Sequence, residues 1–231
     1  MFFTEFIRTI KSTIKVFENC STSSRYIAPI IDGFAMLLML CAGACELAMS
    51  QWSSFFAERA LGVTKVMGDL LGPCLFAVLM GVGRTIYGVF GEKINLFTAL
   101  LGCASLCVLC YLGAALLENP VLSLLSCALC GLSVSLMWPG TFSLTAAVYP
   151  KGGTAMFGVL AVLGDIGCSA GPALMGAVSA AMVKSPPTFL ALRSDLSPDQ
   201  LGLKSGMLFC VLFPALILLG VSLMRRFSKQ K

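Results

Sequence analysis

The sequence predicts an all-α membrane protein with six transmembrane helices and both termini in the cytosol. Three observations predict this class. First, 58% of the 231 residues are hydrophobic and 12% are charged. Soluble domains contain about a quarter charged residues, so composition argues against a globular enzyme. Second, the apolar residues form six runs of bilayer-crossing length. Third, the basic residues are divided unevenly between the connections.

Residues 1–25 form the first of three segments and are predicted to be an amphipathic cytosolic helix. The apolar side chains of residues 2–18 fall on one helical stripe, whereas Arg8, Lys11 and Lys15 lie elsewhere around it. Such a helix suits the membrane surface. Packing against the protein's own cytosolic side explains the pattern equally well.

Residues 26–224 form the second segment, a transmembrane domain of six spans, and residues 225–231 form a basic cytosolic tail. Each span has close to the ~20 residues needed to cross the hydrocarbon of a bilayer. Short polar connections separate the spans. We place them at residues 27–48, 64–87, 94–117, 121–148, 154–183 and 205–224.

The distribution of basic residues predicts the orientation. An even number of spans puts both chain ends on one side of the membrane. With those ends in the cytosol, eleven of the 16 Lys and Arg residues lie inside. This satisfies the positive-inside rule. The five outside are Arg59, Lys65, Lys184, Arg193 and Lys204.

The second and fifth spans share a local pattern that predicts a three-plus-three inverted repeat. The second reads GDLLGPCLFAVLMG from Gly68, and the fifth reads GDIGCSAGPALMG from Gly164. Both contain Gly-Asp, then Gly-Pro, then an apolar stretch that ends in Met-Gly. Spans two and five are the pair that such a repeat relates.

Four acidic residues fall within or at the edge of the spans, and we predict that they line a substrate or proton pathway: Asp32, Glu46, Asp69 and Asp165. Carboxylates are rare in hydrocarbon because the charged form loses its hydration, and they usually mark such pathways. Asp165 lies about eleven residues into its predicted span, close to the midplane of the bilayer.

Each of these acids also has a structural explanation. Asp165 and Asp69 could each be a hydrogen-bonded acid that locks two helices together. Glu46 lies near the predicted end of its span, where a solvated acid is common. Asp32 and Glu46 are fourteen residues apart, about 21 Å along a helix, and share one face of the first span.

Two further elements are candidates for the pathway. Trp138-Pro139-Gly140 lies deep within the fourth span, where proline removes a backbone hydrogen bond and predicts a bend. Trp138 could stack on the apolar face of a sugar ring or fill space between helices. Arg84, at the predicted inner end of span two, could bond helix-end carbonyl groups or an acid.

Other functional classes find little support in the residues. Most of the eleven cysteines lie inside apolar runs, where we interpret them as small buried apolar residues. The chain has no histidine, so serine-histidine catalysis is excluded and a zinc site would lack its common ligand. We expect no enzyme activity, no cofactor, no metal and no nucleic-acid partner.

Four motifs resemble the C-terminal six-helix half of a major facilitator superfamily transporter of the fucose-permease-like sugar branch. They are CAGACELAMSQW, GRTIYGVFGEK, WPGTFSLTAA and GDIGCSAGP. The resemblance implies two six-helix halves with the substrate at the midplane between them. It also implies a gating role for Arg84, Glu92 and Lys93, although the family usually has Asp at position 92 and several arginines after it.

These observations together predict a proton-coupled secondary transporter in the cell membrane. It would move a sugar or another small polar solute by alternating access. Its partners would be the solute, protons, the lipid bilayer and a second six-helix half. That half could belong to a longer chain, to a second copy or to another protein. The alternative is a membrane interaction module that does not transport.

Overall fold

The computed structural model describes residues 28–148, 153–184 and 196–228, and the predicted amphipathic segment 1–25 lies outside this part. Six helical segments among these residues are long and apolar enough to cross a membrane. They are Gly33–Leu61, Lys65–Lys93, Leu96–Leu116, Pro120–Ala147, Met156–Lys184 and Pro198–Arg226. The predicted all-helical class with six spans is therefore confirmed. The inverted repeat, the cytosolic termini and the domain boundaries stay predictions.

Three of the spans are single helices: α2 (Ala28–Leu61), α5 (Leu96–Leu116) and α8 (Gly153–Lys184). The other three are interrupted. The second comprises α3 (Lys65–Asp69), the π-helical turn η1 (Leu70–Cys74), α4 (Leu75–Phe90) and the 3₁₀ turn η2 (Gly91–Lys93). The fourth comprises α6 (Pro120–Val134) and α7 (Met137–Val148), and the sixth comprises α10 (Pro198–Cys210) and α11 (Leu212–Ser228).

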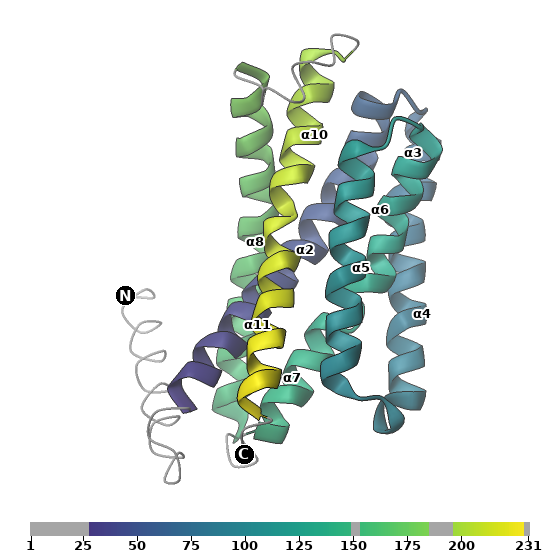
Figure 1. Ribbon diagram of the computed structural model, residues 1–231. Helices are drawn as coiled ribbons and strands as arrows, with labels where there is room; N and C mark the ends of the chain where they lie inside the picture. Colours follow the sequence, from purple (N-terminus) through teal and green to yellow (C-terminus); the bar gives the residue numbers. More distant parts are fainter. Residues whose placement is uncertain (1–27, 149–152, 185–195, 229–231) are drawn as a thin grey trace.

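Helix α2 is the organising element of the bundle. It runs obliquely through the molecule, so that its first half lies beside α8 and α11 and its second half lies beside α6 and η1 (Figure 1). Its side chains supply many of the fully buried core residues, and the hydroxyl of the buried Tyr111 on α5 donates to the Cys45 carbonyl at 2.8 Å. Helix α2 therefore positions the other spans.

Three of the interruptions lie at prolines, whereas Pro172 lies inside the unbroken helix α8. A proline lacks the N–H that would bond the carbonyl four residues earlier. Helix α3 ends four residues before Pro73, and α10 ends four residues before Pro214. Helix α6 ends one residue before Ser135, whose carbonyl Pro139 cannot bond. The bend predicted at Trp138-Pro139-Gly140 is therefore present as the break between α6 and α7.

The first helix is longer than the predicted span 27–48. The polar residues after position 49 suggested a loop, but the helix contains no residue that would stop it before Leu61. Gly62 ends it with a φ of +67°, the left-handed conformation that a helix C-terminus commonly requires of glycine. Glu46 consequently lies near the middle of the helical segment Gly33–Leu61, farther from the helix end than predicted.

The sixth span also begins earlier than predicted, at Pro198. The sequence LSPDQ was interpreted as a helix start, and Ser197 and Gln200 do form a capping box there. Lys204 therefore belongs to a helix and not to the outer loop. It is buried, and its ammonium group donates to the Leu117 carbonyl at 3.0 Å.

The cysteines behave mainly as buried apolar residues, as expected. The ten that the structure describes are free thiols, and seven of them are buried. Cys130 of the CxxC sequence does not lie closest to Cys127. It lies instead beside Cys107 of α5, with 3.8 Å between the two sulfur atoms.

The closest approach of two long helices is the crossing of α2 and α8. Three glycines make it possible, because a Cβ atom at any of them would collide with the other helix: Gly43, Gly167 and Gly171. A Cβ atom at Gly167 would collide with the carbonyl oxygen of Leu40. A Cβ atom at Gly171 would lie 2.6 Å from the Cα atom of Ala44. Small residues permit such backbone contact in membrane bundles.

We predict that Gly167→Ala destabilises the bundle by about 1–3 kcal/mol, because the backbone of α2 would have to move to admit the methyl group. The measurement is the apparent unfolding temperature in detergent, read with a thiol-reactive dye that labels the buried cysteines as they become exposed. Gly158→Ala in the same helix is the control, since its Cβ atom would meet nothing within 4 Å. Equal unfolding temperatures for the two variants would contradict the tight crossing.

Candidate functional site

A charged pair joins α2 and α4. Arg84 Nη2 donates to both carboxylate oxygens of Glu46, each at 3.3 Å. The Glu46 side chain is 14% exposed and that of Arg84 is 45% exposed. The pair therefore lies at the edge of the helix bundle, with Arg84 on the open side. The sequence suggested an acid as one possible partner of Arg84, without indicating which.

The position of the pair along the spans affects the free energy needed to keep its two charges there. Glu46 lies 15 residues before the end of α2, and Arg84 lies nine residues before the end of its span at Lys93. At 1.5 Å per residue these separations are about 22 Å and 14 Å along the helices, so neither group lies near the end of its membrane-length segment. Charges at that depth persist when they are paired or line an aqueous path.

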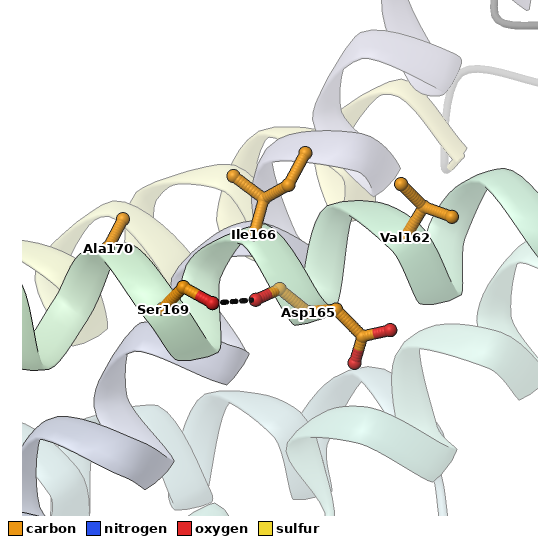
Figure 2. A pocket seen from close by; sticks show the side chains of 5 residues that line it. All are labelled: Val162, Asp165, Ile166, Ser169 and Ala170. Atoms are coloured by element: carbon orange, nitrogen blue, oxygen red, sulfur yellow. Dashed lines mark hydrogen bonds between the residues drawn. The ribbon is translucent and has the colours of Figure 1, made fainter. Parts of the chain in front are cut away.

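Asp165 lies on α8, next to the crossing with α2. Its neighbour Gly164 packs against α2 and Trp138, and this contact fixes the position of the helix turn. Figure 2 shows the side chains of Val162 and Ile166 on one side of α8 and the Asp165 carboxyl group on the other. Within the described residues, this carboxyl group makes no hydrogen bond or ion pair, and Ser169 bonds only its backbone carbonyl, at 3.1 Å.

The surface around Asp165 is hollowed and mostly apolar. The hollow has a volume of about 530 Å³ and is lined by Val162, Asp165, Ile166, Ser169 and Ala170 (Figure 2). All five residues belong to one helix, so the hollow is one wall of a site. A second wall would have to come from elsewhere.

Trp138 packs between α7 and α8. Its ring lies against Gly164 and is 6.3 Å from the ring of Phe142, measured between centroids. The indole Nε1 is buried and has no hydrogen-bond partner in the described part of the chain. A buried indole N–H usually finds a partner. Trp138 therefore fills space between helices and also holds an unused donor.

The remaining predicted residues do not join this group. Asp69 accepts a hydrogen bond from Ser54 on α2. It precedes Arg84 by fifteen residues, which is about 22 Å along the second span. Glu92 and Lys93 are exposed in η2, at the end of the second span. Asp32 lies in α2, but its side chain is outside the described part of the structure.

Sequence reasoning assigned no contact to Trp52. Its indole Nε1 donates to the Pro172 carbonyl of α8 at 3.1 Å, and its ring covers Gly176. Tyr87 was also missed. Its hydroxyl bonds Ser143 across α4 and α7 at 3.1 Å. A polar aromatic side chain in an apolar run is the signal that could have predicted both contacts.

Comparison with known proteins identifies one family. The sequence model of the Major Facilitator Superfamily matches residues 9–172, which include Glu46, Arg84, Trp138 and Asp165. No curated protein and no solved structure gives a significant match.

We predict that Arg84→Leu lowers the stability of the chain by about 1–3 kcal/mol, because it leaves the Glu46 carboxylate without its partner. The double variant Glu46→Gln/Arg84→Leu should recover most of this loss, since neither charge then remains. Unfolding temperatures of both variants and of Glu46→Gln form a double-mutant cycle. Strictly additive effects would show that the pair contributes no coupling energy.

Proposed function

This chain belongs to the Major Facilitator Superfamily, and we propose that it forms one half of a carrier for a sugar or another small polar solute. Membership makes it a multi-pass membrane protein in a family of secondary transporters, which are typically not enzymes. We further propose that this half is the C-terminal half of a fucose-permease-like carrier that works by alternating access. The carrier would lie in the cell membrane, with both ends of this chain in the cytosol.

The observation that carries the proposal is the Glu46–Arg84 pair. An ionic pair in hydrocarbon must offset the cost of removing two charges from water, and a well-packed apolar pair would avoid that cost. Arg84 is also 45% exposed, so its guanidinium group has donors that Glu46 does not use. A pair that is both costly and accessible is better explained by transport than by stability.

We assign proton coupling to the same pair. Arginine keeps its charge under all relevant conditions, so Glu46 is the group that gains and loses a proton. Protonation would neutralise Glu46 and free Arg84 to bind hydroxyl oxygens of the solute. Deprotonation would restore the pair and favour release. Proton and solute binding are thereby linked through one residue.

Trp138 and Asp165 would form the solute side of the site. The indole N–H of Trp138 is buried and unused, so it could donate to a solute hydroxyl where α7 and α8 separate during alternating access, and its ring face would then suit the apolar face of a sugar. The Asp165 carboxylate can accept from further hydroxyl groups or take part in proton transfer. The sugar itself is proposed from the resemblance to the fucose-permease-like branch.

A second six-helix half would supply the missing wall. The exposed apolar residues of α4 include Val78, Val82 and Ile86, and those of α8 include Val162 and Ile166. Arg84 and Asp165 lie on the same two helices. A partner that covers α4 would enclose Arg84, and one that also covers the Asp165 side of α8 would enclose that carboxyl group. Glu92 and Lys93, at the end of the second span, are proposed as part of a gate on the resemblance alone.

We predict that Glu46→Gln abolishes proton-coupled uptake, because the amide cannot exchange a proton. The purified chain is first tested for its oligomeric state, together with its second half if one is identified. It is then reconstituted in vesicles, where solute-driven alkalinisation is recorded for a panel of sugars. Glu46→Gln should lower the coupled signal at least tenfold while solute exchange without a proton gradient continues.

Glu58→Gln is the matched control for that experiment, because Glu58 is an exposed acid on the same helix. Unchanged coupling in Glu46→Gln would refute the assignment of Glu46. Loss of coupling in Asp165→Asn alone would move the proton site to α8. Absence of uptake by every assembled form would favour the non-transporting membrane module.

We further predict that Trp138→Phe raises the solute concentration for half-maximal uptake about fivefold to tenfold, corresponding to the loss of one hydrogen bond of about 1 kcal/mol or slightly more. The aromatic ring is retained, so folding should change little. The measurement is the concentration dependence of uptake. An unchanged value would show that the indole N–H does not bind solute.

A further inference from the structure

Two contacts of α4 flank Arg84 and hold this helix beside the break between α6 and α7. Gly83 packs closely against Ser135 in the break, because a Cβ atom at Gly83 would collide with the Ser135 hydroxyl group. Tyr87 lies one turn further along α4, and its hydroxyl donates to Ser143 Oγ of α7 at 3.1 Å. The turn of α4 that carries Arg84 is therefore joined to the break and to the helix beyond it.

Helix α7 is a short segment that follows this break. It has 12 residues, and Pro139 in its first turn cannot bond the Ser135 carbonyl. Residues at the ends of helices can absorb the changes of backbone angle that accompany domain motion. Trp138 and Ser143 lie five residues apart on this one helix. A shift of Ser143 would therefore tilt α7 and move the Trp138 ring relative to α8.

The Tyr87–Ser143 hydrogen bond is the main connection between α4 and α7. Helix α4 packs chiefly against α6, whereas α7 packs chiefly against α2 and α5. Both hydroxyl groups are partly buried in an apolar region. A hydrogen bond there is retained because each group would otherwise lack a partner. A movement of α4 is thus transmitted to α7 mainly through these two side chains.

The position of this turn of α4 depends on the Glu46–Arg84 pair. Arg84 and Tyr87 are three residues apart, so they are neighbours on the helix surface. Arg84 faces Glu46 from α4, and the Cys168 thiol faces it from α8, where Asp165 lies one turn earlier. Helices α6 and α7 carry no charged residue, and the charges of α10 and α11 lie toward the ends of the sixth span. Arg84 is therefore the group that responds when Glu46 loses its charge.

We propose that Tyr87 and Ser143 are positioning residues that link proton exchange at Glu46 to the position of Trp138. The inference rests on the proposed function, in which Glu46 exchanges the proton and Trp138 binds the solute. In the paired state the Trp138 ring lies against Gly164 of α8. When Glu46 takes up a proton, the released turn of α4 moves α7 through the hydrogen bond. The indole N–H then becomes accessible in the same step that frees Arg84.

The test is the fluorescence of Trp138 in the purified full chain, recorded in detergent between about pH 4 and about pH 9. The chain has two tryptophans, so Trp52→Phe leaves Trp138 as the only one. In this background the emission should shift as Glu46 is protonated, and Glu46→Gln should abolish the shift. Tyr87→Phe and Ser143→Ala should each reduce the shift at least fivefold. The double variant should reduce it no further, because both changes remove the same bond.

Two controls separate the link from other effects on the tryptophan. Thr85→Val is the matched control, because the Thr85 hydroxyl lies on the same helix but bonds the Gly81 carbonyl of that helix, at 2.9 Å. Asp165→Asn tests the nearest acid on α8, next to Gly164. Both variants should retain the full shift. If Trp52→Phe does not elute as a folded protein, the spectra of Trp138→Phe are subtracted from those of the unmodified chain to obtain the same signal.

The outcomes distinguish this link from the proposed function. A shift that is lost in Glu46→Gln but kept in Tyr87→Phe would overturn the link and leave the proton site at Glu46. A shift that is kept in Glu46→Gln would overturn both. Absence of a shift in the starting background, or its loss in Asp165→Asn, would also overturn the link.

Discussion

The crossing of α2 and α8 is the contact on which the candidate site depends. Backbone meets backbone there, because Gly43, Gly167 and Gly171 carry no side chains to hold the helices apart. Close packing supplies van der Waals contact in an environment where the hydrophobic effect does not drive helix association. The crossing also sets where Glu46 and Asp165 lie, since each is on one of the two helices, a few residues from these glycines.

Polar contacts then join the remaining spans to α2. Tyr111 bonds the Cys45 carbonyl from α5, Ser54 bonds Asp69 of α3, and Arg84 of α4 binds Glu46. Each contact satisfies a group that would otherwise be unpaired in hydrocarbon, where such groups cost several kcal/mol by order of magnitude. The pair differs from the other two because both partners are charged, and Arg84 is partly open to its surroundings. It therefore combines a structural contact with an accessible charge, which is what a coupling site requires.

The exposed faces of α4 and α8 carry a carboxylate and a guanidinium group, so they suit a second protein half that encloses a polar path. Charge placed along a span indicates an aqueous path, whereas charge placed only at its end indicates the head-group region.

Sequence alone determined the number of spans, the acids within them and most interruptions, because these depend on local chain chemistry. The length of an apolar run determines where a helix can span the membrane. The backbone N–H that proline lacks leaves a carbonyl group unbonded and favours a break in the helix. The tertiary structure decided which side chains meet. Glu46 and Arg84 are 38 residues apart, and Trp52 and Pro172 are 120 apart. Such pairs depend on how helices cross, and the crossing depends on backbone contact at glycines. Periodicity within one span carries no information about that contact.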